Sequence, residues 1–119
     1  MQQLQASQVA DWAKQMTADN PDLVPVVLDV REAWEVQTAA VPDAQAVHGY
    51  RLVHMPMRSV PARCTELDRH QPVACLCHHG ARSMQVAYFL EQNGFTQVAN
   101  VQGGIHAWAT DHDPRIPLY

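Results

Sequence analysis

A cysteine, two histidines, a glycine and an arginine lie together in residues 77–83, which read Cys-His-His-Gly-Ala-Arg-Ser. We call this segment the cysteine loop. Residues 72–76 before it are short, apolar and uncharged, as in a buried strand, and residues 84–93 after it have the spacing of a helix. The thiol of Cys77 is therefore expected where a strand ends and a helix begins, at the sheet edge where open α/β folds bind ligands.

Three features of the cysteine loop favour a thiolate at Cys77, and the thiolate is the reactive form of cysteine. Gly80 lets the backbone fold tightly, so that N–H groups can converge on one point. The helix that follows directs its positive end at the same place. Arg82 has the wrong sign for a helix amino terminus, which suggests that it serves an anion. The alternative is that Cys77 is only a small buried apolar residue.

The cysteine loop resembles the active-site loop of the rhodanese family of sulfurtransferases. Residues 28–35, Leu-Asp-Val-Arg-Glu-Ala-Trp-Glu, resemble the amino-terminal signature of that family, and residues 101–108, Val-Gln-Gly-Gly-Ile-His-Ala-Trp, resemble its carboxyl-terminal signature. The three motifs occur in the same order as in the family, and together they indicate the family more specifically than any one motif does. The resemblance implies an α/β fold with an open, mostly parallel five-stranded sheet and helices on both faces, in a single domain over residues 1–119.

The resemblance also implies an activity. Cys77 would take a sulfane sulfur from a small anionic donor such as thiosulfate, or from a persulfide, and hold it as a persulfide. The acceptor would be cyanide or a thiol, and a protein acceptor is a further option. The donor would be bound by the rest of the loop: His78, His79, Gly80, Ala81, Arg82 and Ser83. Three residues of the amino-terminal signature would support this edge structurally: Asp29, Arg31 and Glu35.

Two rival hypotheses use the same thiolate. Cysteine phosphatases and arsenate reductases place five residues between cysteine and arginine, whereas four lie between Cys77 and Arg82. The shorter loop suits one sulfur better than a tetrahedral phosphate. A persulfide carrier or redox-sensing module for a protein partner would share both fold and site, so the sequence does not separate it from an enzyme.

Composition narrows the function classes. The 119 residues, 47% of them hydrophobic, suffice for one globular domain with a core. The net charge is −4 and we find no basic run, which argues against a nucleic-acid surface. No stretch approaches the roughly 20 apolar residues that cross a bilayer, and no signal-peptide pattern opens the chain. Three cysteines do not suit a disulfide framework, so we expect a reduced, cytoplasmic compartment.

No metal and no other cofactor is expected. Adjacent side chains such as His78 and His79 rarely converge on one ion, and no second ligand pair lies at metal spacing. Cys75 would share a strand face with Cys77, yet too far away for an easy disulfide, so it is expected in the core. Cys64 is expected to be structural, in the middle of a helix.

Apolar spacing and helix-breaking residues predict the elements around the loop. The predicted helices cover residues 6–16, 59–67 with Ser59 as N-cap, 84–93 closed by Gly94, and a short segment through Trp108 and Ala109. The predicted strands cover residues 25–29, 72–76 and 96–101, with a weak candidate at 44–47. Alternating strands and helices imply βαβ units and a mostly parallel sheet.

Three local expectations complete the prediction. Arg31 and Glu35 are four residues apart and can pair if a helical turn forms. Gly103 and Gly104 are expected to meet a backbone requirement in a tight turn. The tail over residues 111–119 holds two prolines and is expected on the surface.

Overall fold

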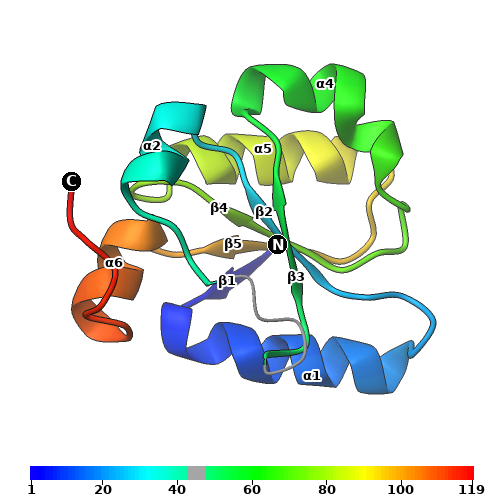
Figure 1. Cartoon of the computed structure of the whole chain (residues 1–119). Helices are drawn as coiled ribbons and strands as arrows, with labels where there is room; N and C mark the ends of the chain where they lie inside the picture. The colour runs from blue at the N-terminus through cyan, green and yellow to red at the C-terminus, as the bar shows by residue number, and fades with distance from the viewer. Residues whose placement is uncertain (43–47) are drawn as a thin grey trace.

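The computed structural model describes residues 1–42 and 48–119. Its centre is one sheet, in which the strand order is β1-β5-β4-β2-β3 and each described pair is parallel (Figure 1). The strands are β1 (Gln2–Leu4), β2 (Val26–Asp29), β3 (Arg51–His54), β4 (Val73–Leu76) and β5 (Val98–Val101). The predicted fold class, an open parallel five-stranded α/β sheet, is confirmed.

Helices cover both faces of the sheet (Figure 1). One side carries α1 (Val9–Asp19) and α6 (Gly104–Asp111), and the other carries α4 (Val60–Arg63) and α5 (Ala81–Gln92). A further short helix is α2 (Ala33–Thr38). Short 3₁₀ turns cover Ala6–Gln8, Met57–Ser59 and Cys64–Glu66.

Strand alternation divides the core into two clusters, because successive side chains of a strand point to opposite faces. Val27 and Leu76 pack with the α1 and α6 side, for example against Trp108. Leu28 and Cys75 pack on the other side, with residues of α5. All four residues of β2 and of β4 are buried, and for β4 this confirms the buried strand predicted from the uncharged run over residues 72–76.

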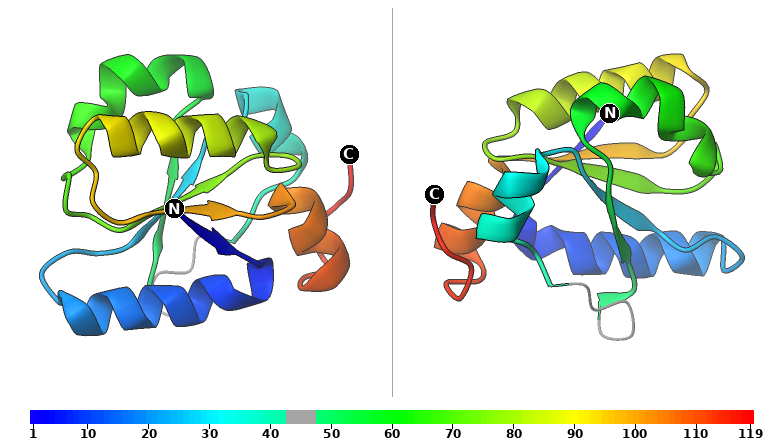
Figure 2. Two further views of the ribbon diagram at one scale, coloured as in Figure 1. Left: turned by 180° about the vertical axis from the view of Figure 1, so that it is seen from behind. Right: turned by 45° about the horizontal axis from the view of Figure 1, so that its top comes forward.

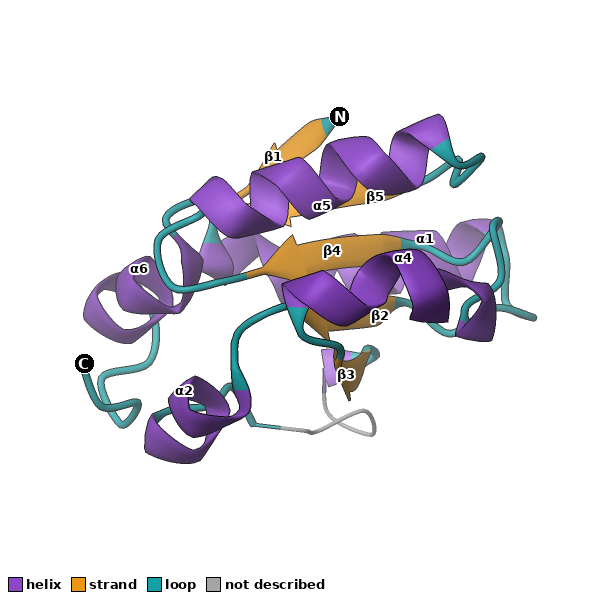
Figure 3. Cartoon of the chain, turned by 90° about the horizontal axis from the view of Figure 1, so that it is seen from above, coloured by secondary structure: helices purple, strands orange, loops and turns teal. Residues whose placement is uncertain are grey.

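The parallel arrangement gathers several segments at the carboxyl edge of the sheet. Register pairs Asp29 of β2 with Leu76 of β4, so Asp29 stands one position before the level of Cys77. The loop from β4 to α5 lies at the same end of the molecule as α2 and α6 (Figure 3). The chemistry-bearing loop therefore sits where open α/β sheets bind ligands, as the sequence predicted.

Several element boundaries differ from the predicted ones. The first helix starts as a 3₁₀ turn and its α-helical part runs on to Asp19. The predicted helix over residues 59–67 is only α4 flanked by 3₁₀ turns, and the Ser59 hydroxyl donates to the Pro56 carbonyl rather than capping. The strand candidate at 44–47 lies outside the described residues. β1 and β3 were not predicted, because β1 is three residues long and β3 has polar ends on a sheet edge.

The prediction that the tail lies on the surface is wrong for Ile116, and Tyr119 is only partly exposed. Ile116 is only 6% exposed and packs in the same cluster as Trp108. The tail then passes beside α6 and α2, so that the last residue, Tyr119, reaches the carboxyl edge of the sheet (Figure 2). The two prolines suggested an exposed tail, but burial of the apolar Ile116 side chain and the hydrogen bonds of Tyr119 hold it against the domain. Within the described part of the chain, no helix has the length and apolar character needed to cross a membrane.

Candidate active site

The backbone of the cysteine loop folds back so that one of its N–H groups contacts the sulfur of Cys77. Cys77 is 1% exposed, and the Gly80 N–H donates to its Sγ at 3.0 Å. Gly80 has φ +110°, a conformation that side chains rarely adopt, and a Cβ there would lie 3.3 Å from the Gly103 nitrogen. Glycine is therefore required for the turn that aims this N–H at the sulfur. A hydrogen bond from a backbone amide stabilises a sulfur anion.

The first turn of α6 clamps the cysteine loop from the other side. The Ile105 N–H donates to the Cys77 carbonyl at 2.9 Å, and the His106 N–H donates to the His78 carbonyl at 3.1 Å. A Cβ on Gly104 would collide with both of these carbonyl oxygens. Gly104 thus permits a close backbone approach, and Gly103, at φ +76°, permits the turn before it. The expected backbone requirement at these two glycines is confirmed.

Ala81 and Ser83, both predicted to bind the donor, differ in how far they are exposed. Ala81 is exposed at the first position of α5. Ser83 is fully buried, and its Oγ lies 2.5 Å from Asn100 Oδ1 and 3.2 Å from the Gly80 carbonyl oxygen. Asn100 in turn donates to Gln3 of β1 at 3.1 Å. Ser83 therefore ties the start of α5 to the sheet, a role in positioning the loop.

Asp29 and Arg31 form a buried ion pair beneath the edge. Arg31 Nη2 lies 2.7 Å from Asp29 Oδ2, and its Nε donates to Asp29 Oδ1 at 2.9 Å. The Arg31 guanidinium also donates to the Tyr119 hydroxyl at 3.0 Å. Burial by itself lowers the pKa of Arg31, but the hydrogen bonds to Asp29 and Tyr119 outweigh it and raise that pKa. This pair fixes the segment that leads into α2.

Arg82 is engaged by a carboxylate from the distant amino-terminal signature. Its Nη1 and Nη2 donate to Glu35 Oε1 and Oε2 at 2.6 and 2.8 Å. The Tyr119 hydroxyl donates to the same carboxylate at 2.7 Å. The bond from Arg82 lowers the pKa of Glu35 to about 2, against the opposing effect of burial. The predicted pairing of Arg31 with Glu35 is wrong for the carboxylate, since Arg31 reaches only the main-chain oxygen of Glu35.

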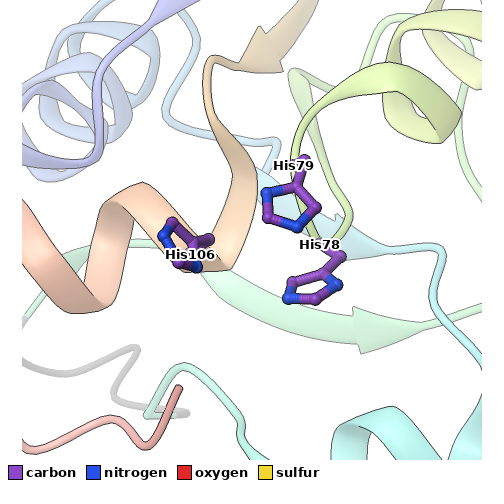
Figure 4. Close-up of side chains that lie close together, drawn as sticks. All are labelled: His78, His79 and His106. Carbon is purple, nitrogen blue, oxygen red and sulfur yellow. The ribbon is translucent and has the colours of Figure 1, made fainter. Parts of the chain in front are cut away.

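Three imidazole rings gather beside the loop (Figure 4). The rings of His78 and His79 lie 3.9 Å apart between centroids, and His106 lies 5.0 Å from His79. The Tyr119 ring stacks on His78 at 3.9 Å with an interplanar angle of 6°. Burial, together with the neighbouring His79, lowers the pKa of His78, so its ring is less protonated near neutral pH than a free histidine.

Sequence reasoning missed three residues of this edge: Asn100, His106 and Tyr119. His106 stands in the carboxyl-terminal signature, and that position next to two glycines was the available signal. Asn100 and Tyr119 carried no local signal, because their partners lie far away in the chain.

The other two cysteines differ in environment from Cys77, and all three are free. Cys75 is fully buried, which confirms its predicted place in the core, and burial raises the pKa of its thiol. Cys64 is half-buried in a 3₁₀ turn rather than in the middle of a helix. Among the three thiols, Cys77 alone has the strand–loop–helix setting with a backbone N–H on its sulfur.

Known proteins resemble this chain in sequence and in fold. The family model described as "Rhodanese-like domain" matches residues 9–111. A relative named "Sulfurtransferase" from Allochromatium vinosum is 35% identical over 95 residues, covering 80% of this chain and 79% of that protein. A "Thiosulfate sulfurtransferase GlpE" from Pseudomonas savastanoi pv. phaseolicola is 31% identical over 83 residues, covering 70% of this chain and 71% of that protein.

A solved structure shares the fold over its whole length. The rhodanese-related protein from Thermoplasma volcanium superimposes with a TM-score of 0.71 at 24% identity, covering all of both chains. The family match spans the strand that carries Asp29, the cysteine loop and the glycine turn that clamps it. The chain therefore belongs to the rhodanese-like domain family.

Proposed function

We propose that this protein is a sulfurtransferase that carries a sulfane sulfur from an anionic donor to a thiophilic acceptor as a persulfide on Cys77. The observation that carries the proposal is the Gly80 N–H, which donates to the Cys77 sulfur at 3.0 Å inside a closed loop. Relatives named sulfurtransferases support the reaction class, and one of them is named for thiosulfate.

The first half-reaction is a displacement at sulfur. The Cys77 thiolate attacks the outer sulfur of thiosulfate and forms a new S–S bond. The original S–S bond of thiosulfate breaks, and sulfite leaves with the bonding electron pair. The negative charge then rests on the terminal sulfur of the persulfide, close to backbone amides that can stabilise it.

The second half-reaction returns the enzyme to its starting state. Cyanide attacks the terminal sulfur, the persulfide bond breaks, and thiocyanate leaves while Cys77 regains its thiolate. A thiol acceptor would take the same sulfur and become a persulfide. Two half-reactions through one covalent form predict ping-pong kinetics.

Arg82 has a double role in this proposal. Glu35 occupies two of the five N–H groups of its guanidinium, and its side chain is 36% exposed. The ion pair with Glu35 fixes the position of the guanidinium, and the remaining N–H groups can bind the sulfonate oxygens of the donor. Arg82 is thus an oriented donor rather than a free cation, since Glu35 offsets its charge.

Sulfur loading followed by mass spectrometry tests the proposal. Incubation with thiosulfate should add the mass of one sulfur atom, and cyanide should remove it. Cys77→Ser should abolish the added mass, while Cys64→Ser, at a half-buried thiol outside the loop, should keep it. Full loading of Cys77→Ser would overturn the assignment. Stoichiometric loading without multiple turnover would favour a persulfide carrier instead of an enzyme.

A further inference from the structure

Three histidines, two in the cysteine loop and one in α6, form a cluster to which the proposed sulfur-transfer steps assign no role. His78 and His79 come from the loop, and His106 comes from the first turns of α6. One ring nitrogen of each residue, either Nδ1 or Nε2, can be chosen so that the three atoms all lie within 4.8 Å of one another. The rings face a common space between the loop and α6 (Figure 4). We call these three residues the histidine cluster.

Two nitrogens of the histidine cluster have no hydrogen-bond partner among the described residues. They are His78 Nε2 and His106 Nδ1, and both atoms are buried. Buried polar atoms are normally hydrogen-bonded, because leaving one unpaired costs the free energy of its lost hydration. Unpaired nitrogens in a cluster of imidazoles thus suggest a ligand that takes electron pairs.

The backbone holds the cluster in place. The His106 N–H donates to the His78 carbonyl at 3.1 Å, so α6 and the loop approach through their main chains. Tyr119 stacks on His78, which restricts the rotation of that ring. His79 is the exposed member, and its side chain can adjust. His78 and His106 are therefore held near each other, and the exposed His79 side chain can move to complete the site when an ion binds.

We propose that His78, His79 and His106 bind a divalent transition-metal ion of the class that prefers imidazole, such as Zn²⁺. The set contains no carboxylate, so it does not suit the oxygen-seeking ions Mg²⁺ and Ca²⁺. Zinc bonds imidazole nitrogen at about 2.0–2.1 Å, which puts tetrahedral ligand atoms about 3.4 Å apart. The present separations of up to 4.8 Å would have to shorten to that distance when the ion binds.

Three protein ligands leave one coordination position open. Water or an incoming thiol can occupy that position. Since two of the ligands are the loop residues that follow Cys77, a bound ion would hold the loop and obstruct the approach of a sulfur donor. We therefore expect Zn²⁺ to inhibit sulfur transfer reversibly, and this consequence, unlike the binding itself, rests on the proposed function.

Calorimetric titration with Zn²⁺ in a Cys77→Ser background tests the site without competition from the reactive thiol. We expect one saturable site. His106→Gln should weaken its affinity for Zn²⁺ by about tenfold or more, because even the loss of a residue that hydrogen-bonds to a metal ligand has an effect of that size. His112→Gln is the matched control, since His112 is an exposed histidine directly after α6 and outside the cluster. It should leave the affinity unchanged. Absence of a saturable site, or equal affinity in both variants, would overturn the proposal.

Nuclear magnetic resonance of the imidazole nitrogens gives a second test that alters no cluster residue. The chain has seven histidines. Zn²⁺ should shift the ring signals of three of them, His78, His79 and His106. A response confined to other histidines would refute the site even if His106→Gln failed to fold. Zinc binding in a protein that cannot be loaded with sulfur would refute the proposed function and leave the metal site standing.

Discussion

The ion pair between Glu35 and Arg82 makes stability depend on pH in a predictable direction. The pKa of Glu35 falls from its usual 4.5 to about 2 in the folded protein, chiefly through its bond to Arg82. A carboxyl group whose pKa is lower when folded stabilises the protein above its unfolded pKa. That contribution is lost as pH falls through the folded pKa. The loss should therefore begin below about pH 5 and be nearly complete by about pH 2.

The size of this contribution follows from the shift. One pKa unit corresponds to about 1.4 kcal/mol, so the shift in Glu35 has an upper bound of about 3 kcal/mol. Glu35 is 4% exposed, but Arg82 is 36% exposed, and water screens part of the attraction. We expect Glu35 to contribute about 1–2 kcal/mol to the free energy of unfolding at pH 7 beyond its contribution near pH 2.

Urea denaturation at a series of pH values measures this contribution. Glu35→Gln keeps the shape and removes the charge, so the gap in unfolding free energy between wild type and variant should shrink by about 1–2 kcal/mol from pH 7 to pH 2.5. Glu66→Gln is the matched control, because Glu66 pairs with Arg63 at 3.0 Å on the surface. Its gap should stay small at every pH. A constant gap for Glu35→Gln across this pH range would refute the reasoning.

The other predictions concern the loop and its supports. Tyr119→Phe keeps the ring on His78 but removes the hydroxyl that donates to Glu35 at 2.7 Å. Urea titration should show that the free energy of unfolding falls by about 1 kcal/mol. An unchanged free energy of unfolding would mean that this hydroxyl does not anchor the tail. Gly80→Ala should abolish sulfur loading, because alanine is strained at φ +110° and the turn that aims the N–H at the sulfur would change. Gly49→Ala is the control: at φ +77° with only ordinary contacts, it should cost similar stability and keep loading. Normal loading in Gly80→Ala would contradict the role of the Gly80 N–H. Arg82→Gln should slow thiosulfate loading about tenfold or more, because it removes N–H donors to the anion and leaves the Glu35 carboxylate uncompensated. Alkylation by iodoacetamide, which is neutral, should slow less. Equal slowing of both reactions would exclude a role in donor binding.

The conformation of the cysteine loop could be predicted from the residues next to it in the sequence. Cys77, Gly80 and the flanking apolar runs are contiguous, so a strand, a tight turn and a helix could be inferred from spacing alone. The same holds for Gly103 and Gly104, because a double glycine after a strand indicates a turn or a close approach. These features depend on backbone conformation, which neighbouring residues largely decide.

Only the tertiary structure decided which charged and aromatic groups meet at the edge. Arg82 and Glu35 are 47 residues apart, and Tyr119 is 84 residues from Glu35, so no periodicity could pair them. Apolar spacing indicates which side of an element is buried but not which element covers it. The third histidine of the cluster, His106, became visible only when α6 was packed against the loop, since two adjacent histidines alone argued against a metal.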